Sequence, residues 1–137
     1  MHSIFHLAFN VTDLDTACEF YSNILGCQQG RKTDSWVDYN FFGHQLSLHL
    51  GQPFHVEATG KVDNIAVPMP HFGAILSFPH WNQLAQKLQN LQLDFIIAPS
   101  IRFEGQAGEQ HTMFFTDPFG NPIELKSFAD PEQVFNV

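Results

Sequence analysis

The chain carries the same order of predicted elements twice, and this repeat restricts the possible folds more than any other feature. Each half reads as a strand, a helix and three further strands. When the halves are aligned, His6 matches His71, and Ser47 occupies the position that mirrors Glu124. Internal duplication predicts two copies of one supersecondary unit that share a core. We therefore expect an α+β fold of two βαβββ modules, which form a curved, largely antiparallel or mixed eight-stranded sheet around a cavity, with the helices outside.

The first module, residues 1–50, is predicted from strand alternation and from its turn residues. Apolar side chains alternate through a strand at residues 4–11, and capping-type residues then open a helix that Gly26 closes. Gly43-His44 is a hairpin signal between the last two strands. The three later strands are expected near residues 28–31, 36–42 and 45–50.

The second module, residues 71–128, repeats this order after a predicted linker at residues 51–70. Proline and glycine interrupt the linker, which shows no sustained periodicity, although residues 62–67 are compatible with a short extended piece. A polar loop is expected at residues 100–110. The tail at residues 129–137 is expected to pack as a short helical turn or to fray. The two modules together form one domain.

His6, His71 and Glu124 each fall on the polar side of an apolar strand pattern. Because successive strand residues alternate faces, all three side chains point away from the core and are free to converge on one concave surface. Two imidazoles and one carboxylate, with coordination positions left open, suit Fe(II), Mn(II), Zn(II) or Ni(II). The alternative is that the three residues are simply solvated on the wet face of an antiparallel sheet.

Charge and composition exclude several classes of partner. The formal net charge is −8, with six basic and fourteen acidic residues, which argues against nucleic acid and anionic membranes. No apolar run approaches the roughly 18 residues of a membrane span, and the N-terminus lacks a signal peptide pattern, so a cytoplasmic protein is expected. Fifteen phenylalanines favour either an aromatic-lined pocket for a small apolar or aromatic ligand, or a core rich in phenylalanine.

The two ends of the repeat resemble the vicinal oxygen chelate superfamily of glyoxalases, bleomycin-resistance proteins and extradiol dioxygenases. Residues 5–15, followed by residues 20–21 and 24–26, are similar to the opening of that family, and residues 114–125 are similar to its closing signature. The resemblance spans nearly the whole chain. A bacterial subgroup usually labelled "predicted dioxygenase" is closer still, and its likeness is carried by residues 36–38, 42–45, 67–73 and 108–115.

The resemblance implies that the first strand and the last strands of the modules bind one divalent metal ion. Family glyoxalases fill four ligand positions, whereas the dioxygenases use two histidines and one glutamate. This chain has His6, His71 and Glu124 at matching positions and Ser47 at the fourth. Serine is a poor ligand for these metals, so three protein ligands fit better, with Fe(II) favoured. His49 lies two residues beyond Ser47 and is an alternative fourth ligand.

The acid–base group of the reaction is not evident from the sequence. Family dioxygenases have a tyrosine where this chain has Phe114, which transfers no proton. His49 and His111 are weak catalytic candidates, and solvated histidines are the plainer interpretation of both. The loop after Arg102 suits a mobile cover, in which Arg102 would pair with an anionic substrate, or it is a plain solvent loop. The expected substrate contacts are Ser47, Phe114 and Arg102.

Three functional classes follow from these residues. The first is a metal-dependent, dioxygenase-like enzyme acting on a small aromatic or oxygen-chelating substrate. The second is a non-oxidative isomerase or lyase of the glyoxalase type, in which the metal stabilises an enediolate. The third is a metal-free protein that sequesters an aromatic compound, as bleomycin-resistance relatives do. Because family relatives often dimerise, sometimes exchanging modules, we also expect a homodimer.

Overall fold

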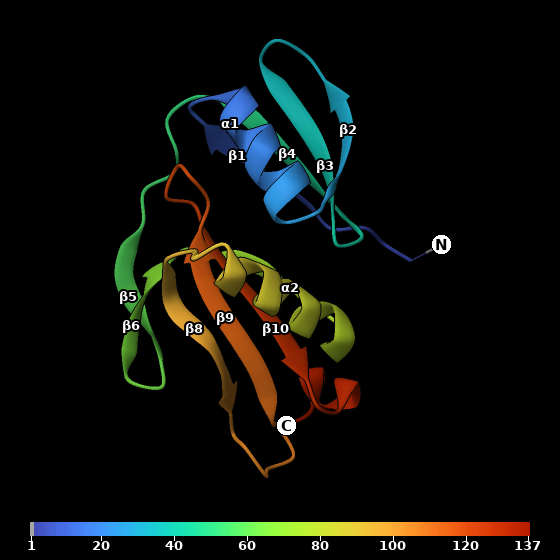
Figure 1. Cartoon of the computed structure of the whole chain (residues 1–137), viewed down its shortest axis with the longest axis vertical. Helices are drawn as coiled ribbons and strands as arrows, with labels where there is room; N and C mark the ends of the chain where they lie inside the picture. Colours follow the sequence, from blue (N-terminus) through green and yellow to red (C-terminus); the bar gives the residue numbers. More distant parts are fainter. Residues whose placement is uncertain (1) are drawn as a thin grey trace. The chain divides into compact units, whose positions relative to one another are not determined.

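The computed structural model describes residues 2–137 and contains the two βαβββ-like modules that the repeat predicts. Within these residues the module strands form two four-stranded mixed sheets, and two further strands form a separate hairpin. The contacts divide the chain into two units, Met1–His55 with Asp117–Asn121, and Val56–Thr116 with Pro122–Val137. Figure 1 shows one α-helix with each four-stranded sheet. The α+β class and the repeat are therefore confirmed.

The sheet of the first unit has the strand order β1-β4-β3-β2. Asp13 caps its helix, because the carboxylate accepts hydrogen bonds from the backbone N–H groups of Asp15 and Thr16. Gly26 and Gly43 have φ angles of 74° and 95°, which close the helical segment and the β3–β4 hairpin as the sequence predicts. The elements are β1 (His6–Val11), α1 (Leu14–Cys18), a π-helical segment (Glu19–Ile24), β2 (Gln28–Lys32), β3 (Trp36–Phe41) and β4 (His44–Leu50).

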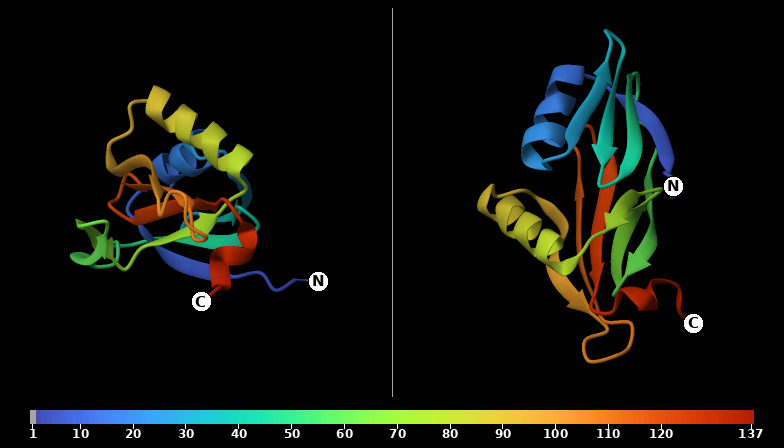
Figure 2. Two further views of the ribbon diagram at one scale, coloured as in Figure 1. Left: turned by 90° about the horizontal axis from the view of Figure 1, so that it is seen from below. Right: turned by 90° about the vertical axis from the view of Figure 1, so that its right-hand side faces the viewer.

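The sheet of the second unit has the equivalent order, β7-β10-β9-β8. Its amphipathic helix α2 buries Trp81, Leu84 and Leu88, and the indole Nε1 of Trp81 donates a hydrogen bond of 2.9 Å to the Leu125 carbonyl. The two views of Figure 2 show α2 on one side of this sheet and a β-hairpin on the other. The elements are β7 (Phe72–Ile75), α2 (Phe78–Asn90), β8 (Phe95–Arg102), β9 (Gln110–Thr116), β10 (Pro122–Phe128) and a 3₁₀ turn (Pro131–Phe135).

That hairpin, β5 (Glu57–Val62) and β6 (Ile65–Met69), occupies the segment predicted as a linker. Its turn residues Asp63 and Asn64 have φ angles of 47° and 70°, which is the backbone of a tight hairpin turn. Val62 and Val67 are buried in a cluster with Ile97 of β8 and Phe114 of β9. Residues 51–70 are thus more than a connection, because β5 and β6 cover the face of the sheet opposite α2.

The register of the strands supports the alignment of the two halves. In each sheet the first strand runs parallel to the last, β1 with β4 and β7 with β10. Ala8 pairs with Ser47, and Gly73 pairs with Glu124. Each pair lies two residues after the histidine of its module, so Ser47 and Glu124 occupy equivalent positions in the two sheets.

The loop expected at residues 100–110 is shorter than predicted. β8 continues to Arg102, and β9 already begins at Gln110. The continuation has a physical reason, since Ser100 and Ile101 remain paired with β9 through Thr112 and His111. Among the residues described, none of the helices has both the length and the apolar character to cross a membrane.

Candidate metal centre

His71 immediately precedes β7, and its imidazole is held in place by contacts on two sides. Its Nδ1 lies 2.9 Å from the carbonyl oxygen of Pro68, which only accepts hydrogen bonds, so Nδ1 carries the proton. The ring of Phe114 packs against the imidazole with ring centres 4.7 Å apart. In the neutral ring the lone pair is then on Nε2, and this atom points toward Glu124. A backbone carbonyl that fixes the tautomer in this way is typical of histidines that bind metals.

Glu124 faces His71 from the middle of β10 and is almost completely buried, with 6% of its side chain exposed. Its Oε1 lies 3.4 Å from Nε2 of His71. Its Oε2 accepts a hydrogen bond of 2.7 Å from the hydroxyl of Thr112 on β9. The ammonium of Lys126, two residues along β10, lies 3.9 Å from Oε1. The carboxylate is thus oriented through one oxygen and presents the other to the imidazole.

The spacing of His71 and Glu124 fits a shared cation. Two donor atoms that each lie about 2.1 Å from one tetrahedral divalent ion are about 3.4 Å apart. A neutral imidazole Nε2 and a carboxylate oxygen are both hydrogen-bond acceptors, so a proton or a metal ion is needed between them. Nitrogen and oxygen donors of this kind suit Zn(II), Mn(II), Fe(II) or Ni(II). The pair has the chemistry of two ligands of a metal centre.

Gly73 makes this arrangement possible on the neighbouring strand. It pairs with Glu124 in the parallel β7–β10 ladder. A Cβ atom at this position would overlap the backbone carbonyl group of Glu124. Glycine therefore allows β7 to approach β10 closely, which brings His71 within reach of the carboxylate.

His6, the third predicted ligand, belongs to the other unit. It is exposed at the start of β1, where it pairs with Gln45 of β4. Within residues 2–137 no group of three histidine, cysteine, aspartate or glutamate side chains lies close enough together to hold a metal ion. The structure thus brings together two of the three predicted ligands, and the participation of His6 remains a prediction.

Ser47, the counterpart of Glu124, has a partner of its own. Its hydroxyl donates a hydrogen bond of 2.6 Å to Oδ1 of Asp38 on β3. Asp38 also lines a pocket of about 370 Å³, and Gln45, the strand partner of His6, contributes to the wall of that pocket. The other polar lining residues include Arg31, Asn40 and His44. His6 is not among the residues that line this pocket.

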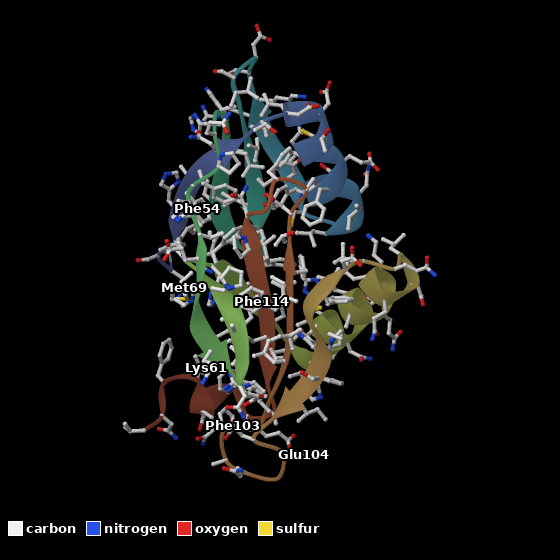
Figure 3. The ribbon with its side chains drawn as sticks, turned by 90° about the vertical axis from the view of Figure 1, so that its left-hand side faces the viewer. Phe54, Lys61, Met69, Phe103, Glu104 and Phe114 are labelled. Atoms are coloured by element: carbon white, nitrogen blue, oxygen red, sulfur yellow. The ribbon has the colours of Figure 1, made fainter. Side chains whose placement is uncertain are left out.

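The remaining predicted residues have other roles in the structure. Phe114 is completely buried beneath the β5–β6 hairpin, so it supports His71 and presents no surface to a substrate (Figure 3). His111 lies on the opposite face of β9 from Thr112, where its ring contacts Phe78 and Trp81 of α2. It therefore does not face Glu124, and the sequence-based suggestion of His111 as an acid–base group is not supported by this placement.

His49 and Arg102 also have partners outside the His71–Glu124 pair. His49 lies in the first unit with its ring against Trp36 at 6.3 Å. Arg102 ends β8, and its Nε lies 3.0 Å from a carboxylate oxygen of Asp63 in the hairpin turn. Along β9, the position that pairs with Arg102 is four residues from the one that pairs with Glu124, which corresponds to about 13 Å. Arg102 therefore links the end of β8 to the turn of the β5–β6 hairpin.

Sequence reasoning missed Thr112, Lys126 and the carbonyl of Pro68. Lys126 follows Glu124 by two positions, so strand alternation alone places both on one face. Thr112 becomes a neighbour of Glu124 only through the β9–β10 register, which a single sequence does not specify. The carbonyl of Pro68 leaves no sequence signal, because every residue has one.

Asp117, a buried carboxylate in the first unit, accepts hydrogen bonds from several neighbouring residues. Asp117 accepts hydrogen bonds from the Tyr21 hydroxyl at 2.8 Å, from the side chain and backbone of Asn121 and from the backbone of Phe119. Burial raises the pKa of Asp117, and these hydrogen bonds act against the increase. Burial and the Asp117 charge together raise the pKa of Tyr21 well above its ordinary value. The Tyr21 hydroxyl therefore keeps its proton and donates a structural hydrogen bond to Asp117.

Comparison with known proteins agrees with this architecture. A crystal structure of a glyoxalase/bleomycin resistance protein/dioxygenase from Alicyclobacillus acidocaldarius is 31% identical, with a TM-score of 0.80, over 97% of this chain and 96% of that chain. A glyoxalase/dioxygenase from Nostoc punctiforme shares the fold, with a TM-score of 0.68 and 16% identity over 93% of this chain and 92% of that chain.

A curated relative and a family model extend the match to most of the sequence. The metallothiol transferase FosB of Lysinibacillus sphaericus is 27% identical over 91% of this chain and 82% of its own length. The model of the Glyoxalase/Bleomycin resistance protein/Dioxygenase superfamily matches residues 3–125. The chain therefore belongs to the glyoxalase/bleomycin resistance protein/dioxygenase superfamily.

Proposed function

We propose that this protein is a metal-dependent enzyme that acts on a small, oxygen-chelating substrate. The observation that carries the proposal is the geometry of His71 and Glu124, whose donor atoms face each other at 3.4 Å. The second atom of each group is already engaged, by Pro68 and by Thr112. Hydrogen bonds that fix both side chains in this way have little purpose in a protein that only sequesters an apolar compound. They are the usual support of metal ligands.

His6 is the third ligand in this proposal. It is the counterpart of His71 in the repeat, and two imidazoles with one carboxylate form the donor set of metal-dependent oxygenases with open coordination positions. The proposed cofactor is one divalent metal ion, Fe(II) first, with Mn(II), Zn(II) or Ni(II) as alternatives. When bound, the ion supplies Lewis acidity and a template for a bidentate substrate.

The residues around the ligands would prepare the site for chemistry. The carbonyl of Pro68 keeps the proton on Nδ1 of His71, and the Thr112 hydroxyl prevents rotation of the Glu124 carboxylate. Phe114 and the apolar cluster beneath the β5–β6 hairpin exclude water from the inner side of the imidazole. A low-dielectric surrounding strengthens the electrostatic interactions of the bound substrate.

We place oxygenation first among the possible reactions, in keeping with the donor set. One observation favours the non-oxidative alternative. Phe114 pairs with Glu124 in the β9–β10 register, so the strand position directly opposite Glu124 offers no acid–base group. A transfer, isomerase or lyase reaction, in which a metal-bound group activates the substrate, fits that environment. The name of the curated relative, a metallothiol transferase, likewise denotes a non-oxidative reaction.

The metal set is tested by elemental analysis of protein purified without added metal. We expect close to one divalent ion per chain in the wild type. The variants His6→Ala, His71→Ala and Glu124→Ala should each lose tightly bound metal while circular dichroism shows a retained fold. His111→Ala is the matched control, because its ring packs against α2 on the opposite face of β9, and it should keep the full content. Full metal content in all three ligand variants would refute the proposed set.

The reaction class is tested on the same preparations. After anaerobic loading with Fe(II), oxygen uptake is measured with catechols of increasing size. Substrate-dependent uptake that disappears in Glu124→Ala supports oxygenation. Protein that retains zinc or nickel and consumes no oxygen supports the non-oxidative class instead. A wild-type protein that binds no metal but binds aromatic compounds would be a sequestering protein.

A further inference from the structure

The pocket of the first unit carries two opposite charges that do not pair with each other. Its wall includes the guanidinium of Arg31 on β2 and the carboxylate of Asp38 on β3. Within residues 2–137 no ion pair joins these two groups, and the exposed Arg31 side chain has no hydrogen-bond partner. All lining residues belong to the first unit. The volume of about 370 Å³ is within the usual range of small-molecule sites.

A β-bulge in β2 determines how these charges are presented. The register shifts between Gln29 and Lys32, so that Gly30 and Arg31 together oppose the single residue Asp38. Bulges redirect side chains and are frequent beside functional sites. A Cβ atom at Gly30 would lie 3.4 Å from the Cβ of Asp38, so a longer side chain there would occupy the space beside the carboxylate. Glycine at this position therefore leaves Asp38 accessible from the pocket.

The carboxylate of Asp38 is oriented through one oxygen and open at the other. Its Oδ1 accepts the hydrogen bond of 2.6 Å from Ser47, whose side chain is buried. In the described part of the chain no donor contacts Oδ2. An ionised carboxylate accepts several hydrogen bonds, and a partly buried one without a cationic partner is incompletely satisfied. An ammonium group in the pocket would supply both the missing donor and the opposite charge.

The remaining polar lining side chains add donors without adding charge. The Nδ1 atom of His44 accepts a hydrogen bond of 3.0 Å from the backbone N–H of Phe5, so the proton of the neutral ring is on Nε2. The Oδ1 atom of Asn40 accepts a backbone hydrogen bond of 2.7 Å, which leaves its NH₂ group as a donor. Gln45 contributes a second amide, and Ile4 contributes apolar surface. The wall as a whole is thus electrically neutral, with one group of each charge.

We propose that this pocket binds a small zwitterion, whose ammonium contacts Asp38 and whose carboxylate contacts Arg31. The planar guanidinium of arginine matches a carboxylate and forms two parallel hydrogen bonds with it. A simple anion would bring a second negative charge next to Asp38, and a simple cation would bring a second positive charge next to Arg31. A ligand that carries both charges avoids either repulsion. The site requires no metal ion, so this inference does not rest on the proposed function.

The test is a titration of the full chain, observed through its backbone amide signals by NMR. The zwitterionic probes are glycine, β-alanine and 4-aminobutyrate, which differ in the separation of their charges. Butyrate and propylamine are matched probes with a single charge. We expect the best zwitterion to shift the signals of Gly30 and Asp38 and to bind about tenfold more tightly than either single-charge probe, because each of these lacks one charge-assisted hydrogen bond.

Two variants assign the contacts separately. Asp38→Asn keeps an acceptor for Ser47 but removes the negative charge, and Arg31→Gln removes the guanidinium. Each should weaken the binding of the best zwitterion about tenfold. Asp38→Asn should not weaken the binding of butyrate, and Arg31→Gln should not weaken that of propylamine. Lys61→Gln removes an exposed cation from β5 of the second unit and is the matched control, with wild-type affinity expected.

The outcomes separate this inference from the proposed function. If no zwitterion shifts the pocket signals, if butyrate binds as tightly as the zwitterions, or if both variants bind like the wild type, the inference is overturned. Each titration is repeated after divalent metal has been removed with a chelator, and the affinity should not change. Binding that disappears with the metal would place the ligand on the metal ion and would also overturn the inference. None of these results alters the metal content that tests the proposed function.

Discussion

At the scale of single residues, the orientation of Glu124 depends on one hydroxyl. Thr112 donates to Oε2 at 2.7 Å, while Oε1 remains directed at His71. Both residues are buried, which limits the access of solvent to this hydrogen bond. The orientation of this proposed metal ligand is then determined by Thr112, a neighbour that is not itself a proposed ligand.

The first prediction concerns this hydroxyl. Thr112→Val keeps the shape of the side chain but removes the donor, so we expect metal affinity to fall by about 10- to 100-fold. Competition with a fluorescent chelator measures the change. Thr112→Ser retains the hydroxyl and serves as the matched control, with affinity close to that of the wild type. Equal affinity in the valine variant would mean that Thr112 does not orient the carboxylate.

The second prediction concerns Asp117 and its pH dependence. Because the folded-state pKa of this carboxyl is raised, the stability associated with the group is full below its ordinary pKa and decreases as the pH rises through the raised value. Tyr21→Phe removes a donor to the ionised form and raises this pKa further. The variant should therefore lose about 2 kcal/mol in the free energy of unfolding at pH 7, and less at pH 4.

Urea denaturation between pH 4 and pH 8 measures this difference. Tyr39→Phe is the matched control, because the hydrogen-bond partners of its hydroxyl are uncharged, the Ser22 hydroxyl at 2.7 Å and the Cys18 carbonyl at 3.5 Å. Its effect on stability should not change over the same range. A Tyr21→Phe effect that is constant with pH would contradict the assigned coupling.

At the scale of elements, the parallel pairing of β7 with β10 determines how close His71 lies to Glu124. Strand alternation in the sequence was sufficient to predict both strands and the polar side of each. The β5–β6 hairpin was not predicted, because its burial depends on contacts with Ile97 and Phe114 that are distant in the sequence. Asp63-Asn64, with both φ angles positive, was the turn signal that could have indicated it.

The third prediction tests the β7–β10 contact. Gly73→Ala places a Cβ against the backbone of Glu124, so the strands must separate. We expect a loss of about 1–3 kcal/mol in the free energy of unfolding and a reduced metal content. Thermal denaturation and elemental analysis measure the two effects. Gly108→Ala is the control, since a Cβ there meets no atom within 4 Å. If the two variants have the same stability and metal content, close packing at Gly73 is unimportant.

At the scale of the whole molecule, the repeat and the fold could be predicted from sequence more fully than the site. The alternation of His6, His71 and Glu124 indicated a metal set, and the structure brings His71 and Glu124 together. The sequence pattern could not indicate the partners of Phe114, His111 and Arg102, because these contacts depend on strand register and on the packing of α2 and the hairpin. The predicted homodimer remains a prediction.

The fourth prediction concerns the stability of the metal-loaded protein. A ligand that binds only the folded chain stabilises it, by about 2.7 kcal/mol when its concentration is 100 times the dissociation constant. Removal of metal with a chelator should therefore lower Tm by at least about 5 °C. Differential scanning fluorimetry measures this shift. Glu124→Gln, which is nearly isosteric but uncharged, should show no comparable decrease, and an equal decrease would assign the stabilising metal to another site.

The hydrogen bond from Ser47 to Asp38 reveals a difference between the two copies when it is set beside that from Thr112 to Glu124. Both join a hydroxyl to a carboxylate across neighbouring strands, yet the acid is on β3 in one copy and on β10 in the other. The negative charge thus lies on the third strand of the first sheet repeat and on the last strand of the second, although the strand order of the two sheets is equivalent. The carboxylate of the second copy therefore faces His71, whereas that of the first copy is the acceptor for Ser47.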